Sequence, residues 1–267
     1  RKGRDDLLPL WVADMDFQLP EEILADFRAR IDHGIFGYTD PDQEYYDALD
    51  HWFFARHGYH VDPETVIVGC GVVYGLATGV KAFTKEGDAI LIQQPVYYPF
   101  REVIEDNGRV FINNQLHYEN GRYTVDFEDF ERKIVENNVK VFLLCNPHNP
   151  VGRVWTKDEL ERMGDICLRH QVIIMDDEIH CDLIRCDKKH IPMGKVMPDY
   201  KRLITCMAPS KTFNLAGMMI SNVIIRDEGL KEIWLGRHYN FDNPLSIAAA
   251  QAAYEKGEPW LEELRAY

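Results

Sequence analysis

The chain has 267 residues, 46% of them hydrophobic, which is enough to bury the core of one large domain. Its 44 acidic residues exceed its 30 basic ones, and the formal charge of −14 would repel nucleic acids and anionic membranes, so neither is an expected partner. The apolar runs are too short to cross a bilayer and the first residues lack a signal segment, which predicts a cytoplasmic protein.

Helical and strand-like segments alternate along the chain, which predicts an α/β fold with a mostly parallel sheet between helices. Helices are expected over residues 21–33 and 42–57, each opened by a proline and followed by a glycine. A β-branched strand at 65–68 then leads through Gly69-Cys70-Gly71 into an apolar helix at 72–83. The remaining expected strands are 89–93, 109–113, 139–145, 172–175, 203–206 and 219–225. The remaining expected helices are 98–106, 127–137, 157–170 (with a Thr156–Glu159 capping box) and 243–255.

The six cysteines are scattered through apolar runs without Cys-x-x-Cys pairs, as is typical of reduced core thiols. The possible ligands His180, Cys181, Cys186 and His190 match no standard zinc spacing. The sequence therefore predicts no metal site.

Polar residues follow several predicted strands, at the sheet edge where open α/β proteins bind ligands. The turn at Gly71 can seat a phosphate on free backbone N–H groups, although a glycine there can also serve a tight turn alone. Asn149 follows the strand at 139–145, where Asn-Pro is equally a common turn former.

Asp176 and Asp177 follow the strand at 172–175. Two buried carboxylates would repel, so we expect one to point outward and the other to meet a cation such as a pyridinium. The alternative is a pair of helix-capping or solvated acids. His180 can stack or hydrogen-bond beside Asp177, or it can be purely structural.

Lys211 stands out among the lysines because it follows an apolar strand and a proline turn and precedes further apolar residues. Its amine is expected in a partly desolvated crevice, where the neutral form becomes accessible. Such a lysine can form an imine.

Three segments in this order resemble a known superfamily: residues 146–152 (NPHNPVG), 177–180 (DEIH) and 210–217 (SKTFNLAG). They look like the fold-type I pyridoxal-phosphate enzymes of the aspartate aminotransferase superfamily, over nearly the whole chain. Residues 11–17 (WVADMDF), 36–39 (FGYT) and 176–183 (DDEIHCDL) are most similar to the branch of bacterial cystathionine β-lyases and related cysteine-S-conjugate β-lyases.

The resemblance implies that pyridoxal 5′-phosphate (PLP) forms a Schiff base with Lys211, which also abstracts the substrate Cα proton. It implies that Asp177 pairs with the pyridinium nitrogen, that Asn149 binds the ring hydroxyl, and that Tyr97 stacks on the ring, where the alternative is a packed loop aromatic. The other implied cofactor-binding residues are His180, the Gly71-Val72-Val73 backbone, Ser210, and Tyr38 from the neighbouring subunit of a homodimer.

Two positions depart from the pattern of many aminotransferases: Ala208 and Met219 stand where a serine and an arginine serve the phosphate. The resemblance implies that the arginine that grips the substrate carboxylate lies beyond Tyr267. Both ends of the chain look cut. The resemblance implies an N-terminal segment over 1–35 (small domain and dimer contacts), a PLP-binding large domain over 36–240, and the start of an incomplete small domain over 241–267.

The implied function is α,β-elimination from L-cystathionine or a related cysteine S-conjugate, giving a thiol, pyruvate and ammonia. Class I/II aminotransferase activity is an alternative, since it shares every step up to the Cα carbanion. A non-catalytic PLP-binding relative is another, because a fold does not guarantee chemistry. An NAD-dependent oxidoreductase is weaker, since the turn at Gly71 lacks the third glycine of the dinucleotide fingerprint.

Overall fold

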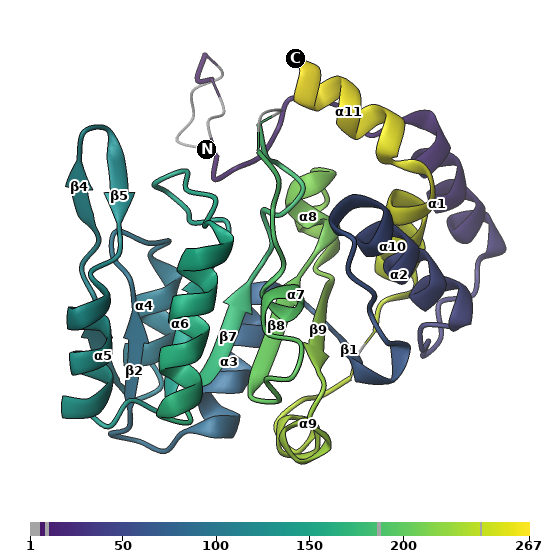
Figure 1. The fold of residues 1–267 in the computed structure, drawn as a ribbon. Coiled ribbons are helices and arrows are strands. Elements are labelled where there is room, and N and C mark those ends of the chain that lie inside the picture. Colours follow the sequence, from purple (N-terminus) through teal and green to yellow (C-terminus); the bar gives the residue numbers. More distant parts are fainter. Residues whose placement is uncertain (1–5, 9–10, 186–187, 241) are drawn as a thin grey trace.

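A computed structural model describes residues 6–8, 11–185, 188–240 and 242–267, and it confirms the predicted αβα architecture (Figure 1). Its central sheet has seven strands, and β9 alone runs antiparallel to its neighbours while the other pairs are parallel. In sheet order the strands are β1 (Val66–Gly69), β9 (Ser221–Ile225), β8 (Leu203–Met207), β7 (Ile173–Asp177), β6 (Val141–Cys145), β2 (Ala89–Ile92) and β3 (Val110–Asn113).

Helices cover both faces of the sheet because its strands are apolar on both sides. Along β6, for example, Leu143 packs toward one face, whereas Phe142 and Leu144 pack toward the other. The first face is covered by α3 (Val72–Phe83), α4 (Pro99–Glu105) and α9 (Glu228–Leu235). The second is covered by α5 (Phe127–Glu136), α6 (Lys157–Arg169) and α7 (Met193–Val196) (Figure 1).

A third hydrophobic cluster lies beside the β1 edge of the sheet and joins the two ends of the described chain (Figure 1). Buried Tyr45, Trp52 and Ala250 belong to it. Its helices are α1 (Glu21–His33), α2 (Gln43–His57), α10 (Pro244–Lys256) and α11 (Glu258–Ala266). Two 3-10 turns, η1 (Pro63–Thr65) and η2 (Ala216–Met218), and the short helix α8 (Pro209–Thr212) complete the described elements of this region.

The predicted elements agree with the structure to within one or two residues at most ends, and the Thr156 capping box is present. The strand predicted from 219 begins at Ser221, because Met219 has a left-handed backbone (φ 51°) that a strand cannot hold. The hairpin of β4 (His117–Glu119) and β5 (Arg122–Thr124) was not predicted. Its strands are short and mostly exposed, so they lack the alternation of apolar and polar residues that predicts a strand.

No helix in the described part of the chain is both long and apolar enough to span a membrane. Cys186, one of the four residues weighed above as metal ligands, lies outside the described residues.

Candidate active site

A cavity of about 410 Å³ opens at the carboxyl ends of β1, β6, β7 and β8. This is the edge at which open parallel sheets bind ligands. All of the predicted site residues except Tyr38 line this one cavity, namely Gly71, Val72, Val73, Tyr97, Asn149, Asp177, His180, Ser210 and Lys211.

The N-terminus of α3 forms one wall of the cavity. Gly71 has a φ of 141°, a conformation that suits glycine, and its N–H donates to Ser221 Oγ at 3.1 Å. At the start of an α-helix the first N–H groups, here those of Val72 and Val73, have no acceptor within the helix. No side chain caps the start of α3 either. A Cβ built on Gly71 would meet no atom within 4 Å, so the space beside the turn is open. The wall offers positive backbone dipoles to an anion.

Asp177, the last residue of β7, contributes an acidic side chain to the cavity wall. Its side chain is buried and, among the residues that the structure describes, accepts a hydrogen bond only from the N–H of Ile179, at 3.1 Å. Burial, with a contribution from Glu178, raises the pKa of the Asp177 carboxyl to about 7. Within the described residues it has no cationic partner, so a cation entering the cavity would find an uncompensated carboxylate.

The prediction that one of Asp176 and Asp177 points outward is wrong, because both are buried. Burial, and then the charge of Glu178, raises the pKa of Asp176 well above its usual range, which favours its neutral form. Adjacent strand residues face opposite sides of a sheet. Asp176 therefore faces away from the cavity, toward Asn146 Nδ2 at 3.5 Å, while Glu178 lies 3.1 Å from His190 Nε2.

Lys211 lies on α8, the single helical turn that follows β8. Its side chain is half-buried and has no hydrogen-bond or ion-pair partner among the described residues. Burial, and then the charge of Lys211, lowers the pKa of His180 to about 4, which keeps that imidazole neutral beside the amine. The lysine is thus free to react with a carbonyl group held in the cavity.

Tyr97 and Asn149 are held together at the third side of the cavity. The Tyr97 N–H donates to the Asn149 carbonyl at 2.9 Å, and the Asn149 N–H donates to Cys145 Sγ at 3.4 Å. The Tyr97 ring also contacts Tyr98, with ring centroids 5.1 Å apart. These hydrogen bonds hold the backbones of both residues at the cavity wall.

Tyr38 is the one predicted site residue that the fold does not bring to this cavity. Its side chain is fully exposed (100%). Its predicted role in a neighbouring subunit stays a prediction.

The N-terminal segment contributes cavity residues that sequence reasoning missed. Val12 and Ala13 line the cavity. Asn214, within the SKTFNLAG segment, holds the neighbouring Met15 by accepting its N–H at 3.1 Å and donating Nδ2 to its carbonyl at 2.9 Å. Asn214 has a φ of 53°, which asparagine tolerates better than most residues. The sequence shows only that the motif contains an asparagine, and this does not indicate that Met15 is its hydrogen-bond partner.

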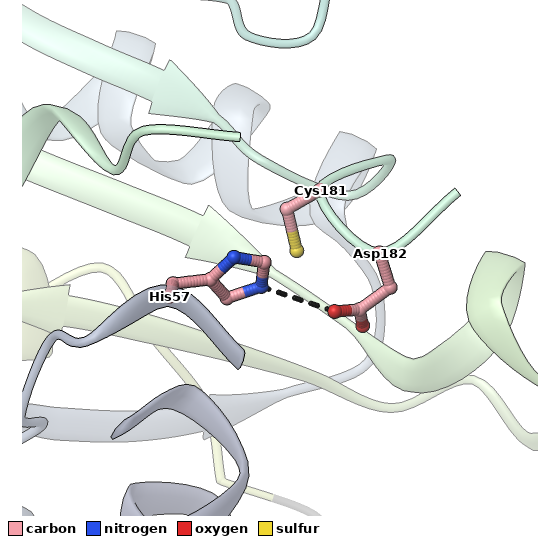
Figure 2. A group of neighbouring side chains, drawn as sticks. All are labelled: His57, Cys181 and Asp182. Carbon is pink, nitrogen blue, oxygen red and sulfur yellow. Dashed lines mark hydrogen bonds and ion pairs between the residues drawn. The ribbon is translucent and has the colours of Figure 1, made fainter. Parts of the chain in front are cut away.

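The structure gathers a different set of possible metal ligands from the set weighed in the sequence. Within the described residues this set is His57, Cys181 and Asp182, whose ligand atoms lie within 4.8 Å of one another (Figure 2). His57 was not considered, because it precedes the other two by more than a hundred residues.

Comparisons with known proteins agree with this geometry. The family described as "Aminotransferase class I and II" matches residues 5–267. The chain is 45% identical to "Cystathionine beta-lyase PatB" of Bacillus subtilis, covering 99% of this chain and 70% of that protein. It is 34% identical to "Protein MalY" of Escherichia coli, covering 100% of this chain and 70% of that protein.

Solved structures give the same result. A PLP-bound C-S lyase from Staphylococcus hominis, complexed with the inhibitor L-cycloserine, superposes with a TM-score of 0.94 at 42% identity. The match covers 96% of this chain and 67% of that chain. Cystalysin from Treponema denticola, which contains pyridoxal 5′-phosphate, gives a TM-score of 0.94 at 36% identity, covering 98% of this chain and 68% of that one.

Proposed function

The chain belongs to the aminotransferase class I and II family, and from this premise we propose that it is a PLP-dependent C–S β-lyase. Its substrate would be L-cystathionine or a related cysteine S-conjugate, and its products a thiol, pyruvate and ammonia. The observation that carries the proposal is a single cavity that joins a free lysine, an unpaired buried carboxylate and an open helix N-terminus. The similarity to a cystathionine β-lyase and a C-S lyase supports the reaction class.

The residues of the cavity fit PLP in charge and in position. The uncapped N-terminus of α3, at Val72 and Val73, suits the phosphate, with Ser210 on the same cavity wall. Asp177 has a buried carboxylate without a cationic partner, which suits the pyridinium nitrogen. Lys211 has a free amine that suits the aldehyde. When bound, PLP supplies an electron sink that stabilises negative charge at the substrate Cα.

The residues that line the cavity would have different roles in the reaction. Asp177 would keep a proton on the ring nitrogen, because its carboxylate is desolvated and an adjacent cation would lower its energy. Lys211 Nζ would be the base that takes the Cα proton of the substrate. His180 would be a poor base for that proton at neutral pH, because burial and the charge of Lys211 lower its pKa to about 4. Asn149 and Tyr97, which line the same cavity, would hold the ring in place.

We further propose that the active form is a homodimer in which Tyr38 reaches the phosphate site of the partner. The support is that Tyr38 is fully exposed in its own subunit. Exposed apolar side chains also adjoin the cavity wall, including Val73, Tyr74 and Met219. A cytoplasmic location likewise stays a prediction.

The reaction can be tested by incubating the PLP-loaded protein with L-cystathionine and measuring pyruvate. Pyruvate should form without an added 2-oxo acid. A strict requirement for 2-oxoglutarate would contradict the lyase proposal and favour an aminotransferase.

Colour separates the enzyme from a non-catalytic relative. The loaded protein should have a visible absorption band that is lost in Lys211→Ala, because the variant has no amine to bind the aldehyde. A protein that stays colourless after incubation with PLP would favour a relative without this chemistry.

A further inference from the structure

The carboxylate of Asp182 is buried in the turn after β7, where three side chains donate hydrogen bonds to it and a fourth forms an ion pair with it. Its Oδ2 accepts from Trp52 Nε1 at 3.1 Å and from Thr212 Oγ1 at 2.9 Å. Its Oδ1 accepts from His57 Nε2 at 3.0 Å (Figure 2) and lies 3.3 Å from Arg56 Nε. The carboxylate does not line the cavity, yet it is fully engaged by residues from α2 and α8.

Thr212 is the residue that follows Lys211 in α8, a helix of only four residues. The next residue, Phe213, is fully buried and packs against Trp52, with ring centroids 5.3 Å apart. Both residues after the lysine are therefore anchored to α2, one through Asp182 and one directly. A single helical turn cannot hold its own orientation, because it contains very few internal hydrogen bonds.

The charge of Asp182 is maintained inside the protein. Burial by itself would raise the pKa of Asp182, but the hydrogen bond and charge of His57, with the charge of Arg56, lower it overall. Arg56 in turn contacts α11, at Glu262 (2.9 Å) and Glu258 (3.5 Å). A charge-assisted hydrogen bond to a buried carboxylate is among the stronger interactions in a protein.

The same cluster is poorly suited to a metal ion. The guanidinium of Arg56 already supplies positive charge beside Asp182 Oδ1 and would repel a dication. Burial, and then the neighbouring charge of Asp182, raises the pKa of the Cys181 thiol well above its usual range, so it is not a thiolate. Metal ligation by cysteine requires the thiolate. The three side chains in Figure 2 are better explained as part of a hydrogen-bonded anchor.

From these contacts we propose that Asp182 and Thr212 are positioning residues, which fix α8 so that Lys211 Nζ points into the cavity. The inference rests on the proposed function, because the orientation of the Lys211 amine affects activity only if that amine reacts. Residues of α2 hold Asp182 in place. The hydrogen bond from Thr212 to Asp182 then restrains α8 and with it the neighbouring Lys211. Removal of the Thr212 hydroxyl should loosen the lysine without changing any group that lines the cavity.

The test compares the PLP-loaded wild type with Thr212→Val, which keeps the shape and removes the hydroxyl, and with Thr212→Ser, which restores it. Thr78→Val is the matched control, because Thr78 is also buried but lies on α3, away from Asp182. For each protein the measurements are kcat and KM for L-cystathionine, the pH at which the visible band of bound PLP changes, and the melting temperature.

Thr212→Val should lower kcat roughly 10- to 100-fold with little change in KM, since displacement of a reacting group has effects of that size. It should also move the pH midpoint of the visible band, and Thr212→Ser should recover both values. An unchanged kcat and midpoint in Thr212→Val would overturn the proposal, as would an equal change in Thr78→Val. Failure of the proposed function is distinct, because the wild type itself would then form neither the visible band nor pyruvate.

Discussion

Asp177 has the two properties that a cation-binding carboxylate needs, which are burial and a lack of any cationic partner within the described residues. Asp176, its neighbour in sequence, is equally buried but accepts a hydrogen bond on the other side of the sheet, and burial raises its pKa well above the usual range. Two identical side chains thus have different surroundings because β7 directs them to opposite faces. Because the residue type is the same, the difference between the two carboxyl groups comes from the side of the sheet that each one faces.

The raised pKa of Asp177 predicts how stability depends on pH in the PLP-free protein. The carboxyl has a pKa of about 7 when folded and an ordinary value of 3.8 otherwise, so it stabilises the fold at low pH. That contribution is complete below about pH 4 and is lost as pH rises through 7. Asn cannot ionise, so Asp177→Asn should become more stable relative to the wild type by roughly 2 to 3 kcal/mol between pH 5 and pH 8.

Urea unfolding of both PLP-free proteins at the two pH values measures this difference, and the other titrating groups cancel in the comparison. Equal changes in the two proteins would contradict a buried, unpaired Asp177. Added PLP should stabilise the wild type more than the variant, because only the wild type offers the ring nitrogen a carboxylate.

At the scale of single elements, short segments are held by side-chain contacts rather than by their own backbone. The N-terminal segment at Met15 is one of them, since Asn214 holds it by two hydrogen bonds. Val12 and Ala13, just before Met15, line the cavity. The contact therefore joins an end of the chain to the segment that carries Lys211.

Asn214→Gly should release the Met15 segment, because glycine keeps the left-handed backbone and removes both hydrogen bonds. Loss of about 1 to 2 kcal/mol of local stability should speed amide hydrogen exchange over residues 11–16 roughly tenfold. Asn214→Asp, which retains the acceptor for the Met15 N–H, should give an intermediate rate. Wild-type exchange in the glycine variant would show that other contacts hold the segment.

The start of α6 is stabilised by a reciprocal cap between Thr156 and Glu159. Thr156→Ala should lower the free energy of unfolding by about 1 kcal/mol, as is usual for loss of an N-cap. Thr156→Ser should be close to the wild type in urea unfolding, because it keeps the capping oxygen. Neither residue lines the cavity, so kcat should stay unchanged, and a fall in kcat would contradict a purely structural cap.

At the scale of the whole molecule, the proposed homodimer would add a residue from a second copy to the site. Tyr38 is exposed in its own subunit, and the proposed dimer would bring it to the phosphate of the partner. An isologous dimer of this kind has two identical sites, each built from both subunits.

Refolding Tyr38→Phe together with Lys211→Ala tests the shared site, because a hybrid dimer then contains one site with both native residues. Each variant alone should be impaired, and an equal mixture should recover about a quarter of the wild-type activity if subunits pair at random. Measurement of pyruvate before and after mixing gives the result. No recovery in a mixture shown to contain hybrids would place Tyr38 outside the partner site.

The sequence by itself predicted most elements and most of the named residues that line the cavity. Apolar strands, the glycine turn at Gly71 and the Thr156 cap act over a few residues, so local chemistry was enough to predict them. The order of strands brought Asn149, Asp177 and Lys211 to one sheet edge, as predicted for an open parallel sheet. That is why the predicted residues line a single cavity.

Only the tertiary structure decided the contacts between distant parts of the chain. The bond from Trp52 to Asp182 joins residues 130 positions apart, and that from Met15 to Asn214 joins residues 199 apart. The burial of Asp176 was likewise settled by helices packed on the far face of the sheet. Such contacts depend on how whole layers pack, and no pattern within a short window of sequence specifies them.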